Sequence, residues 1–229
     1  MFDIENMTNQ NRNIYIPQVN DYILEVNMVS LTENEARVMD FLVRNFLEKY
    51  NINQLAKKLS ISPGGMFKIL KKLRNQNFLI SKEIGNNTFF DINYDSGDVL
   101  DACKFALTEK KTTNPYVRIW IKNLAPLNEK TYLAILFGSV LMKGKEAKDI
   151  DVLLVHDRKD FDEINKIINN IQKIVTKEVH AISMTKEDLI KNINKENEAI
   201  IDAIKTGIVL WGRDILLEVV KNGKTRKSV

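Results

Sequence analysis

The feature that most constrains the fold is a pair of short apolar segments in the second half of the chain, each bordered by residues able to do chemistry. Residues 133–137 (LAILF) form a continuous apolar run that stops at Gly138-Ser139. Residues 150–155 form a second run, which Asp149 precedes and in which Asp151 is the second residue. Short apolar runs bounded by glycine and polar residues are typical of buried strands. The segment between the two runs has room for one helix and a loop.

The chain beyond these two runs continues to alternate between helix and strand patterns. Isoleucines recur at helical spacing after residue 160, and Thr185 with Asp188 indicates a helix N-cap. We predict an α/β domain with a small mixed sheet over 130–213, and a solvated basic tail over 214–229. The remaining elements expected in this half are a charged helix at about 160–175, a strand at 179–184, a helix capped at Thr185 and a last long helix at 199–210.

The first half of the chain begins with helical patterns. Thr32 followed three residues later by Glu35 forms a capping box, and apolar residues then recur with helical spacing until about Tyr50. A second short helix follows. A third helix begins with Ser62 as N-cap and Pro63 at the first helical position, where proline is well tolerated.

A β-hairpin follows these three helices, because a Gly-Asn-Asn turn at 85–87 joins two strand-like runs. Three helices followed by a hairpin predict a winged helix-turn-helix domain. The whole chain is therefore expected to be α+β. We divide it into an N-terminal arm (1–30), the winged helix (31–95), a helical connector (96–129), the α/β domain (130–213) and the basic tail (214–229).

Residues 55–63 (LAKKLSISP) resemble the turn region of winged-helix transcription regulators. The resemblance implies double-stranded DNA as a partner. Between Ser62 and Phe78 the chain has four cations and no acidic residue, which suits a helix lying against phosphates. A pair of glycines weakens the helix start, and close backbone approach to DNA is one reason to retain it. An ordinary solvated face on a protein-docking or dimerisation module stays open. The wing tip carries no cation, which weakens the case for a wing in the minor groove. The candidate DNA-binding residues are Gly64, Gly65, Lys68, Lys71 and Lys72.

Two carboxylates are expected on one face of the second apolar run. Residues two apart in a strand point to the same side, so Asp149 and Asp151 lie together. Two like charges this close repel each other, but their proximity becomes favourable when divalent cations sit between them. Oxygen ligands of this kind suit Mg²⁺. Gly138 lets the backbone approach a phosphate, and Ser139 supplies a hydroxyl and the start of a helix. Two solvated acids at the edge of a strand are the alternative.

Gly-Ser, a spacer of nine residues and Asp-x-Asp together resemble the nucleotidyltransferase superfamily that includes DNA polymerase β and the minimal, MNT-type nucleotidyltransferases. The resemblance covers about residues 130–213. It implies transfer of a nucleoside monophosphate from a nucleoside triphosphate to an acceptor hydroxyl with Mg²⁺. Asp149 and Asp151 would be catalytic and would hold the metal, and Gly138 and Ser139 would bind the triphosphate. Two further lysines could meet phosphate oxygens or simply face solvent, namely Lys143 and Lys145.

The chain departs from this superfamily at a third carboxylate, which active members usually bring from a later strand. The strand beginning at residue 178 has no Asp in its middle, and Glu178 and His180 share one face. We name Glu178 as the third metal ligand, while histidines in such positions more often make local hydrogen bonds. Two function classes stay open: a nucleotidyltransferase, and a catalytically inactive nucleotide-sensing or antitoxin-like transcriptional regulator.

Composition limits the remaining expectations. The 229 residues carry a formal charge of +4 and one cysteine, so an internal disulfide is excluded. No apolar leader or membrane-length segment is apparent, and a cytoplasmic location is expected. Winged helices often act as dimers on two-fold operators, and the apolar faces around Trp120 suit pairing, so we expect a homodimer. A partner toxin stays open, because MNT-type domains often resemble antitoxins.

Overall fold

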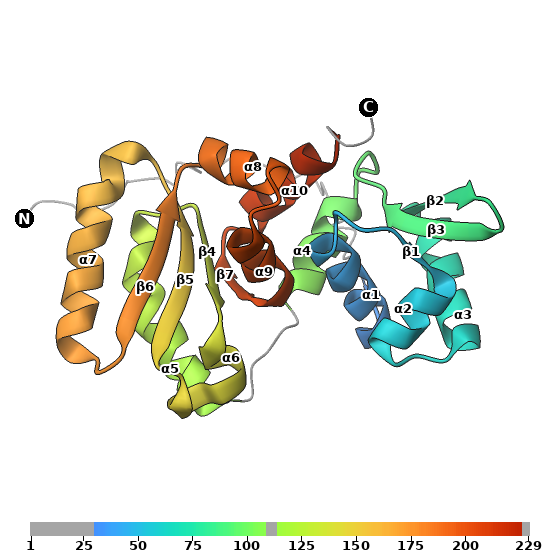
Figure 1. Cartoon of the computed structure of the whole chain (residues 1–229). Helices are drawn as coiled ribbons and strands as arrows, with labels where there is room; N and C mark the ends of the chain where they lie inside the picture. Colours follow the sequence, from blue (N-terminus) through green and yellow to red (C-terminus); the bar gives the residue numbers. More distant parts are fainter. Residues whose placement is uncertain (1–29, 109–113, 226–229) are drawn as a thin grey trace, which may run out of the picture.

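The computed structural model of the chain describes residues 30–108 and 114–225. The predicted N-terminal arm lies outside the described residues except for its last one. The α+β prediction is confirmed: a helical unit with a small sheet adjoins a four-stranded mixed sheet that has helices on both faces (Figure 1). Within the described ranges, no helix has the length and hydropathy that a membrane span needs.

The first unit has the order of helices and strands of a winged helix. The expected capping box forms, since the Thr32 hydroxyl accepts from the backbone N–H of Glu35 and the Glu35 carboxylate accepts from that of Thr32. Ser62 caps the third helix, as predicted. The elements are α1 (Glu33–Arg44), β1 (Tyr50–Asn51), α2 (Ile52–Leu59), α3 (Pro63–Asn75), β2 (Leu79–Ile84) and β3 (Asn87–Ile92), with the strands in the order β1-β3-β2.

The first helix ends earlier than predicted. Asn45 is the C-cap of α1, and the helix ends there because its backbone leaves the helical conformation, at φ −102° and ψ 35°. Its backbone N–H still donates to the carbonyl oxygen of Phe41, and its side-chain amide donates to the same oxygen. The chain then turns, and Tyr50 begins a short strand that pairs with Phe90. The apolar spacing continues through Phe46 and therefore does not reveal this helix end.

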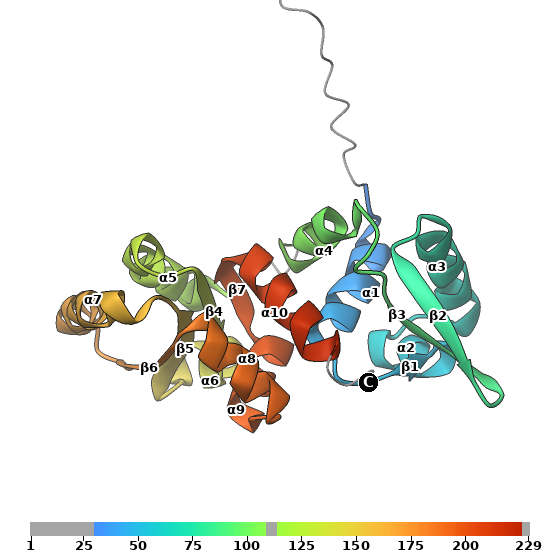
Figure 2. The ribbon, with the colours of Figure 1, turned by 90° about the horizontal axis from the view of Figure 1, so that it is seen from above.

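The second unit is built on a sheet with the strand order β6-β5-β4-β7. β5 pairs antiparallel with β4 and parallel with β6, and β4 pairs antiparallel with β7, which confirms the predicted mixed sheet. Figure 2 shows α5 and α7 on one side of the sheet and α8, α9 and α10 on the other. The elements are α5 (Pro115–Leu124), β4 (Leu133–Phe137), α6 (Ser139–Lys143), β5 (Asp149–Val155), α7 (Phe161–Ile174), β6 (Glu178–Met184), α8 (Lys186–Asn194), α9 (Glu198–Thr206), β7 (Ile208–Trp211) and α10 (Arg213–Thr225).

The last part of the chain differs from the prediction in two ways. The helix expected at 199–210 ends at Thr206. The residues that follow form β7, an edge strand that pairs with β4. The solvated tail expected from residue 214 is instead the helix α10. Leu216, Leu217 and Val220 of α10 are buried, because their helical spacing forms an apolar face. This face packs into the core on one side of the four-stranded sheet.

The helices expected as a connector belong to the two cores. α4 (Val99–Thr108) packs on α1, and α5 packs against the sheet. Trp120 is only 2% exposed, so its apolar face is covered within the chain and does not offer a surface for dimerisation. The prediction that this face mediates dimerisation is therefore wrong.

One hydrophobic core joins the two units. It contains residues of α1 and α4 together with residues of α8, α9 and α10 and one face of β4 and β5. The opposite face of the sheet packs on α5 and α7 in a second core. The winged helix therefore lies on the same side of the sheet as α9 and α10, and α3 lies at the far end of the molecule (Figure 1).

Candidate functional site

Three neighbouring strands bring the predicted acids together. Asp149 and Asp151 lie at the start of β5 and point to the same face. Asp151 is in register with Phe137, the last residue of β4, and with His180 of β6. The end of β4, the start of β5 and the start of β6 therefore meet at one edge of the sheet. The sequence prediction that Asp149 and Asp151 share a face agrees with this geometry.

The Gly-Ser turn lies directly against the two carboxylates. The hydroxyl of Ser139 donates to Asp149 Oδ1 at 3.5 Å. Gly138 has φ of 76° and ψ of −156°, a backbone conformation that residues other than glycine rarely adopt. A Cβ at Gly138 would overlap the carboxylate of Asp151. Backbone and carboxylate can approach each other only because this position has no side chain.

His180 completes a group of atoms that could ligate a metal ion. Its Nδ1 lies 3.6 Å from Asp149 Oδ2 and 3.9 Å from Asp151 Oδ1. One donor atom from each of these three residues lies within 4.8 Å of the other two. Glu178, named from the sequence as the third metal ligand, is absent from this group and instead contacts His180 Nε2 at 3.4 Å. Strand alternation found the shared face but not which of the two residues reaches the aspartates.

The electrostatics of the site favour a cation. Burial raises the pKa of the Asp151 carboxyl above its usual value, the charge of Asp149 raises it further, and His180 lowers it in part. The neighbouring carboxylates of Asp149 and Asp151 repel each other when both are ionised, and a divalent ion between them removes that repulsion. The two carboxylates therefore fit a divalent cation by charge and by ligand type.

The two lysines predicted to meet phosphates lie beside the site in sequence and are exposed. Lys143 ends α6, and Lys145 lies in the single turn of 3₁₀ helix at Gly144–Glu146 that follows. Both side chains extend into solvent from the segment that links Ser139 to Asp149. Their role in nucleotide binding stays a prediction.

The predicted DNA-binding residues lie on and around α3. Lys68, Lys71 and Arg74 are exposed, whereas the Lys72 ammonium donates to both carboxylate oxygens of Glu35 at 2.9 and 3.0 Å. Lys72 thus has an internal partner that the sequence analysis missed. We leave it out of the proposed DNA contacts.

The two glycines at the start of α3 differ in their surroundings. A Cβ at Gly64 would meet no atom within 4 Å, so packing does not require glycine there. A Cβ at Gly65 would press on the Ser62 hydroxyl at 3.0 Å, the same hydroxyl that caps the helix. Internal packing therefore accounts for Gly65, and Gly64 remains a candidate for close approach of a partner.

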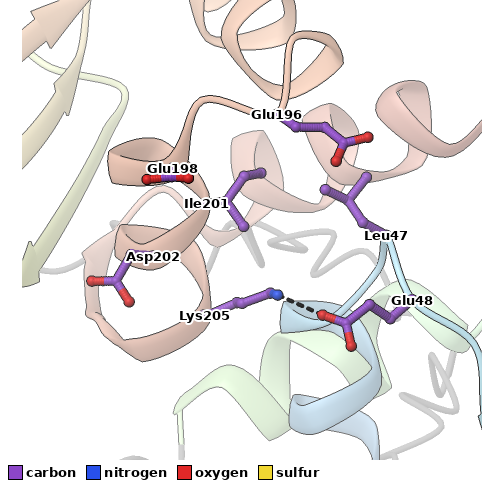
Figure 3. A pocket seen from close by; sticks show the side chains of 7 residues that line it. All are labelled: Leu47, Glu48, Glu196, Glu198, Ile201, Asp202 and Lys205. Atoms are coloured by element: carbon purple, nitrogen blue, oxygen red, sulfur yellow. Dashed lines mark hydrogen bonds and ion pairs between the residues drawn. The ribbon is translucent and has the colours of Figure 1, made fainter.

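A pocket of about 440 Å³ lies between the two units and was not foreseen from the sequence. Figure 3 shows Lys205 of α9 pointing at Glu48, which follows α1, and the two form an ion pair of 2.6 Å. This contact ties the winged helix to the second unit. The lining residues are Leu47, Glu48, Glu196, Glu198, Ile201, Asp202 and Lys205.

Comparison with protein families identifies the class of the second unit. Residues 120–215 match the family model described as "Polymerase beta, Nucleotidyltransferase". The match contains the Gly-Ser turn, both aspartates and the sheet that holds them. This part of the chain is thus a nucleotidyltransferase-type domain, and the winged helix lies outside the match.

Comparison with solved structures finds the ZitR protein of Lactococcus lactis. The wild type in complex with DNA has a TM-score of 0.31 and 21% identity, covering 44% of this chain and 76% of that one. The C30S mutant has a TM-score of 0.30 and 22% identity, covering 44% and 75%. Similarity at this level supports no inference about the present chain. A comparison with curated proteins gave no match.

Proposed function

We propose that the second unit transfers a nucleoside monophosphate from a nucleoside triphosphate to an acceptor hydroxyl, using a divalent cation, in a protein whose winged helix binds double-stranded DNA. The observation that carries this proposal is the contact of the Gly138-Ser139 turn with Asp149 and Asp151. The same edge of the sheet thereby offers ligands for cations and a backbone turn without side-chain obstruction for phosphates.

The residues of the site have separate roles in this reaction. Asp149 and Asp151 hold the cation, which was expected to be Mg²⁺ from the sequence. Ser139 donates a hydrogen bond from its hydroxyl, and Gly138 exposes its backbone to the triphosphate. Lys143 and Lys145 neutralise phosphate charge from the exposed segment beyond α6.

The chemistry consists of one displacement at the α-phosphorus. The acceptor oxygen loses its proton to solvent and bonds to phosphorus, and the bond to the pyrophosphate oxygen breaks. A bound divalent cation supplies charge neutralisation of the triphosphate and lowers the pKa of the attacking hydroxyl. The chain itself contributes mainly positioning.

Label transfer tests this activity. The full chain is incubated with nucleoside triphosphates labelled at the α- or the γ-phosphate, with a divalent cation and candidate protein, nucleic acid and small-molecule acceptors. Transfer of the α label with release of γ label as pyrophosphate is expected, and the double variant Asp149→Ala, Asp151→Ala should lose it. The matched control removes two exposed acids elsewhere, Asp162→Ala with Glu187→Ala, and should keep it. Equal transfer by both double variants would exclude these roles.

A second candidate function is a nucleotide-sensing regulator without transfer chemistry. This candidate is favoured by His180 of β6, which is in register with Asp151 and places an imidazole where a third carboxylate would stand. The shared core between the two units offers a route by which nucleotide binding could alter the winged helix. Nucleotide-dependent DNA affinity without any label transfer supports this candidate over the enzyme.

DNA binding is proposed for the outer face of α3. Lys68, Lys71 and Arg74 are exposed there, and the helix has no acidic residue to oppose phosphates. We also propose a homodimer on two-fold operators, with its interface outside the covered face of Trp120. Sedimentation at micromolar concentration tests the dimer. A partner of the toxin class rests only on the MNT-type resemblance and is tested by co-purification.

A further inference from the structure

His180 occupies the position from which a third ligand would reach the cation. β6 runs parallel to β5, and the register pairs Asp151 with His180, so their side chains stand side by side on one face of the sheet. His180 Nδ1 faces Asp149 and Asp151 at 3.6 and 3.9 Å. The spacing leaves room for an ion among the three donor groups, whose atoms lie within 4.8 Å of one another.

The contact with Glu178 orients the imidazole for this role. Glu178 lies two residues before His180 on the same face, and its Oε2 is 3.4 Å from His180 Nε2. A neutral imidazole carries one N–H, and a carboxylate at Nε2 favours the proton on that nitrogen. The lone pair of Nδ1 then points at the aspartates. Metal-binding histidines are commonly held in this way by a carboxylate on their other nitrogen.

The donor set suits a different ion from the one expected from the sequence. Mg²⁺ prefers oxygen ligands in octahedral geometry and keeps several waters. Imidazole is a ligand for Zn²⁺, Co²⁺ and other first-row transition ions. These ions also bind mixed nitrogen and oxygen sites more tightly than Mg²⁺ does. We propose that Asp149, Asp151 and His180 form a site that binds such an ion in preference to Mg²⁺, with Glu178 as a positioning residue. This inference rests on the proposed function in using the same two aspartates.

Metal titration of the untagged full chain, stripped with a chelator, is the first test. Co²⁺ is added while its visible absorption is followed, and Mg²⁺ is then used as competitor. The wild type is expected to bind Co²⁺ at least about 100-fold more tightly than His180→Ala, and Glu178→Gln to lose about 10- to 100-fold. His180→Asp should restore Mg²⁺ as an effective competitor. Glu187→Ala, an exposed acid on α8, is the matched control and should bind as the wild type does.

Imidazole nitrogen NMR is the second test, and the histidine content of the chain makes it direct. The chain has two histidines, so two sets of ring signals appear, and His180→Ala assigns them. Zn²⁺ is expected to shift the Nδ1 signal of His180 and to leave that of His156, which is buried just beyond the C-terminal end of β5, in place. Unchanged ring signals at saturating Zn²⁺, or equal Co²⁺ affinity of the wild type and His180→Ala, would overturn the inference.

The two proposals fail in different ways. One outcome is that Zn²⁺ or Co²⁺ binds through His180 but no nucleoside triphosphate binds in the presence of any metal ion. This outcome supports the metal site and refutes the transferase. Label transfer with Mg²⁺ that His180→Ala retains at the wild-type rate, with equal Co²⁺ affinity of the two proteins, refutes the histidine ligand and supports the transferase.

Discussion

Arg44 of α1 donates a hydrogen bond of 2.8 Å to the carbonyl oxygen of Gly207, the residue between α9 and the edge strand β7. The same nitrogen also donates to the carbonyl oxygen of Ile204 at 2.9 Å, and Nε pairs with Asp40 at 2.6 Å. Arg44 is 2% exposed. A buried cation in the winged helix thus satisfies the C-terminal carbonyl groups of a helix in the nucleotidyltransferase-type domain, as expected for a cation at a helix C-terminus.

Replacing this arginine should weaken the attachment of the two units. Arg44→Met keeps most of the volume but leaves Asp40 and two buried carbonyl groups without their donor. The free energy of unfolding should fall by about 3 kcal/mol, as for other buried pairs that lose one member. Urea denaturation followed by circular dichroism measures it. Arg37→Met on the same helix, where the side chain is exposed, should cost less than about 1 kcal/mol, and an equal loss in the two variants would contradict this account.

The ion pair between Glu35 and Lys72 should make stability depend on pH. Burial raises the pKa of Glu35, but the hydrogen bonds from Lys72 and Thr32 outweigh it, so the pKa lies below its usual 4.5. A carboxyl group with a lowered pKa in the folded state stabilises the protein above its unfolded value, and this contribution is lost as the pH falls through the folded value. The stabilisation is therefore present at pH 7 and disappears below 4.5.

Lys72→Met tests this dependence. At pH 7 it should lower the free energy of unfolding by about 1 to 2 kcal/mol, the lower part of the range for hydrogen bonds to charged groups, because half of Lys72 is exposed. The difference from wild type should shrink as the pH is lowered below 4.5 in a denaturation series. Lys71→Met, the neighbouring exposed lysine, is the control. A difference that is constant from pH 7 to pH 3 would show that Glu35 is not the partner.

Removal of two exposed cations from α3 should weaken DNA binding in a salt-dependent way. Lys68→Ala with Lys71→Ala should reduce the slope of log affinity against log salt by about two units, since each phosphate contact contributes about 0.9. Fluorescence anisotropy with a labelled duplex at several salt concentrations measures the slope. The control Lys122→Ala with Lys166→Ala removes equal charge from α5 and α7. An unchanged slope in the α3 variant would remove the claim that this helix reads DNA.

Gly138→Ala should disable the site and destabilise the protein. The backbone conformation at Gly138 costs a residue with a Cβ about 1 to 3 kcal/mol, and the added methyl group would displace the Asp151 carboxylate. Binding of a nucleoside triphosphate with a divalent cation, measured by calorimetry, should weaken at least about tenfold, as for a misplaced metal ligand. Gly97→Ala, where a Cβ meets no atom within 4 Å, is the control. Wild-type affinity in Gly138→Ala would show that this turn does not contact the nucleotide.

Much of the fold could be predicted because its signals are local. The capping box at Thr32, the capped start of α3 at Ser62 and the runs that became β4 and β5 depend on residues within a few positions of each other. The pairing of Asp149 and Asp151 on one face follows from the twofold period of a strand and needs no further context. These features agree with the structure to within one or two residues.

Only the tertiary structure decided the features that depend on long-range neighbours. The run 208–211 became a strand because β4 offered it an edge, and α10 became ordered because it covers a core shared by both units. The register of β6 on β5 pairs Glu178 with Asp149 and His180 with Asp151. The side-chain positions then bring His180 into the group with the aspartates, whereas Glu178 contacts His180 Nε2. Strand alternation specifies which face a side chain occupies. Which side chain reaches the aspartates depends on strand pairing and on side-chain conformation, and both are properties of the assembled sheet.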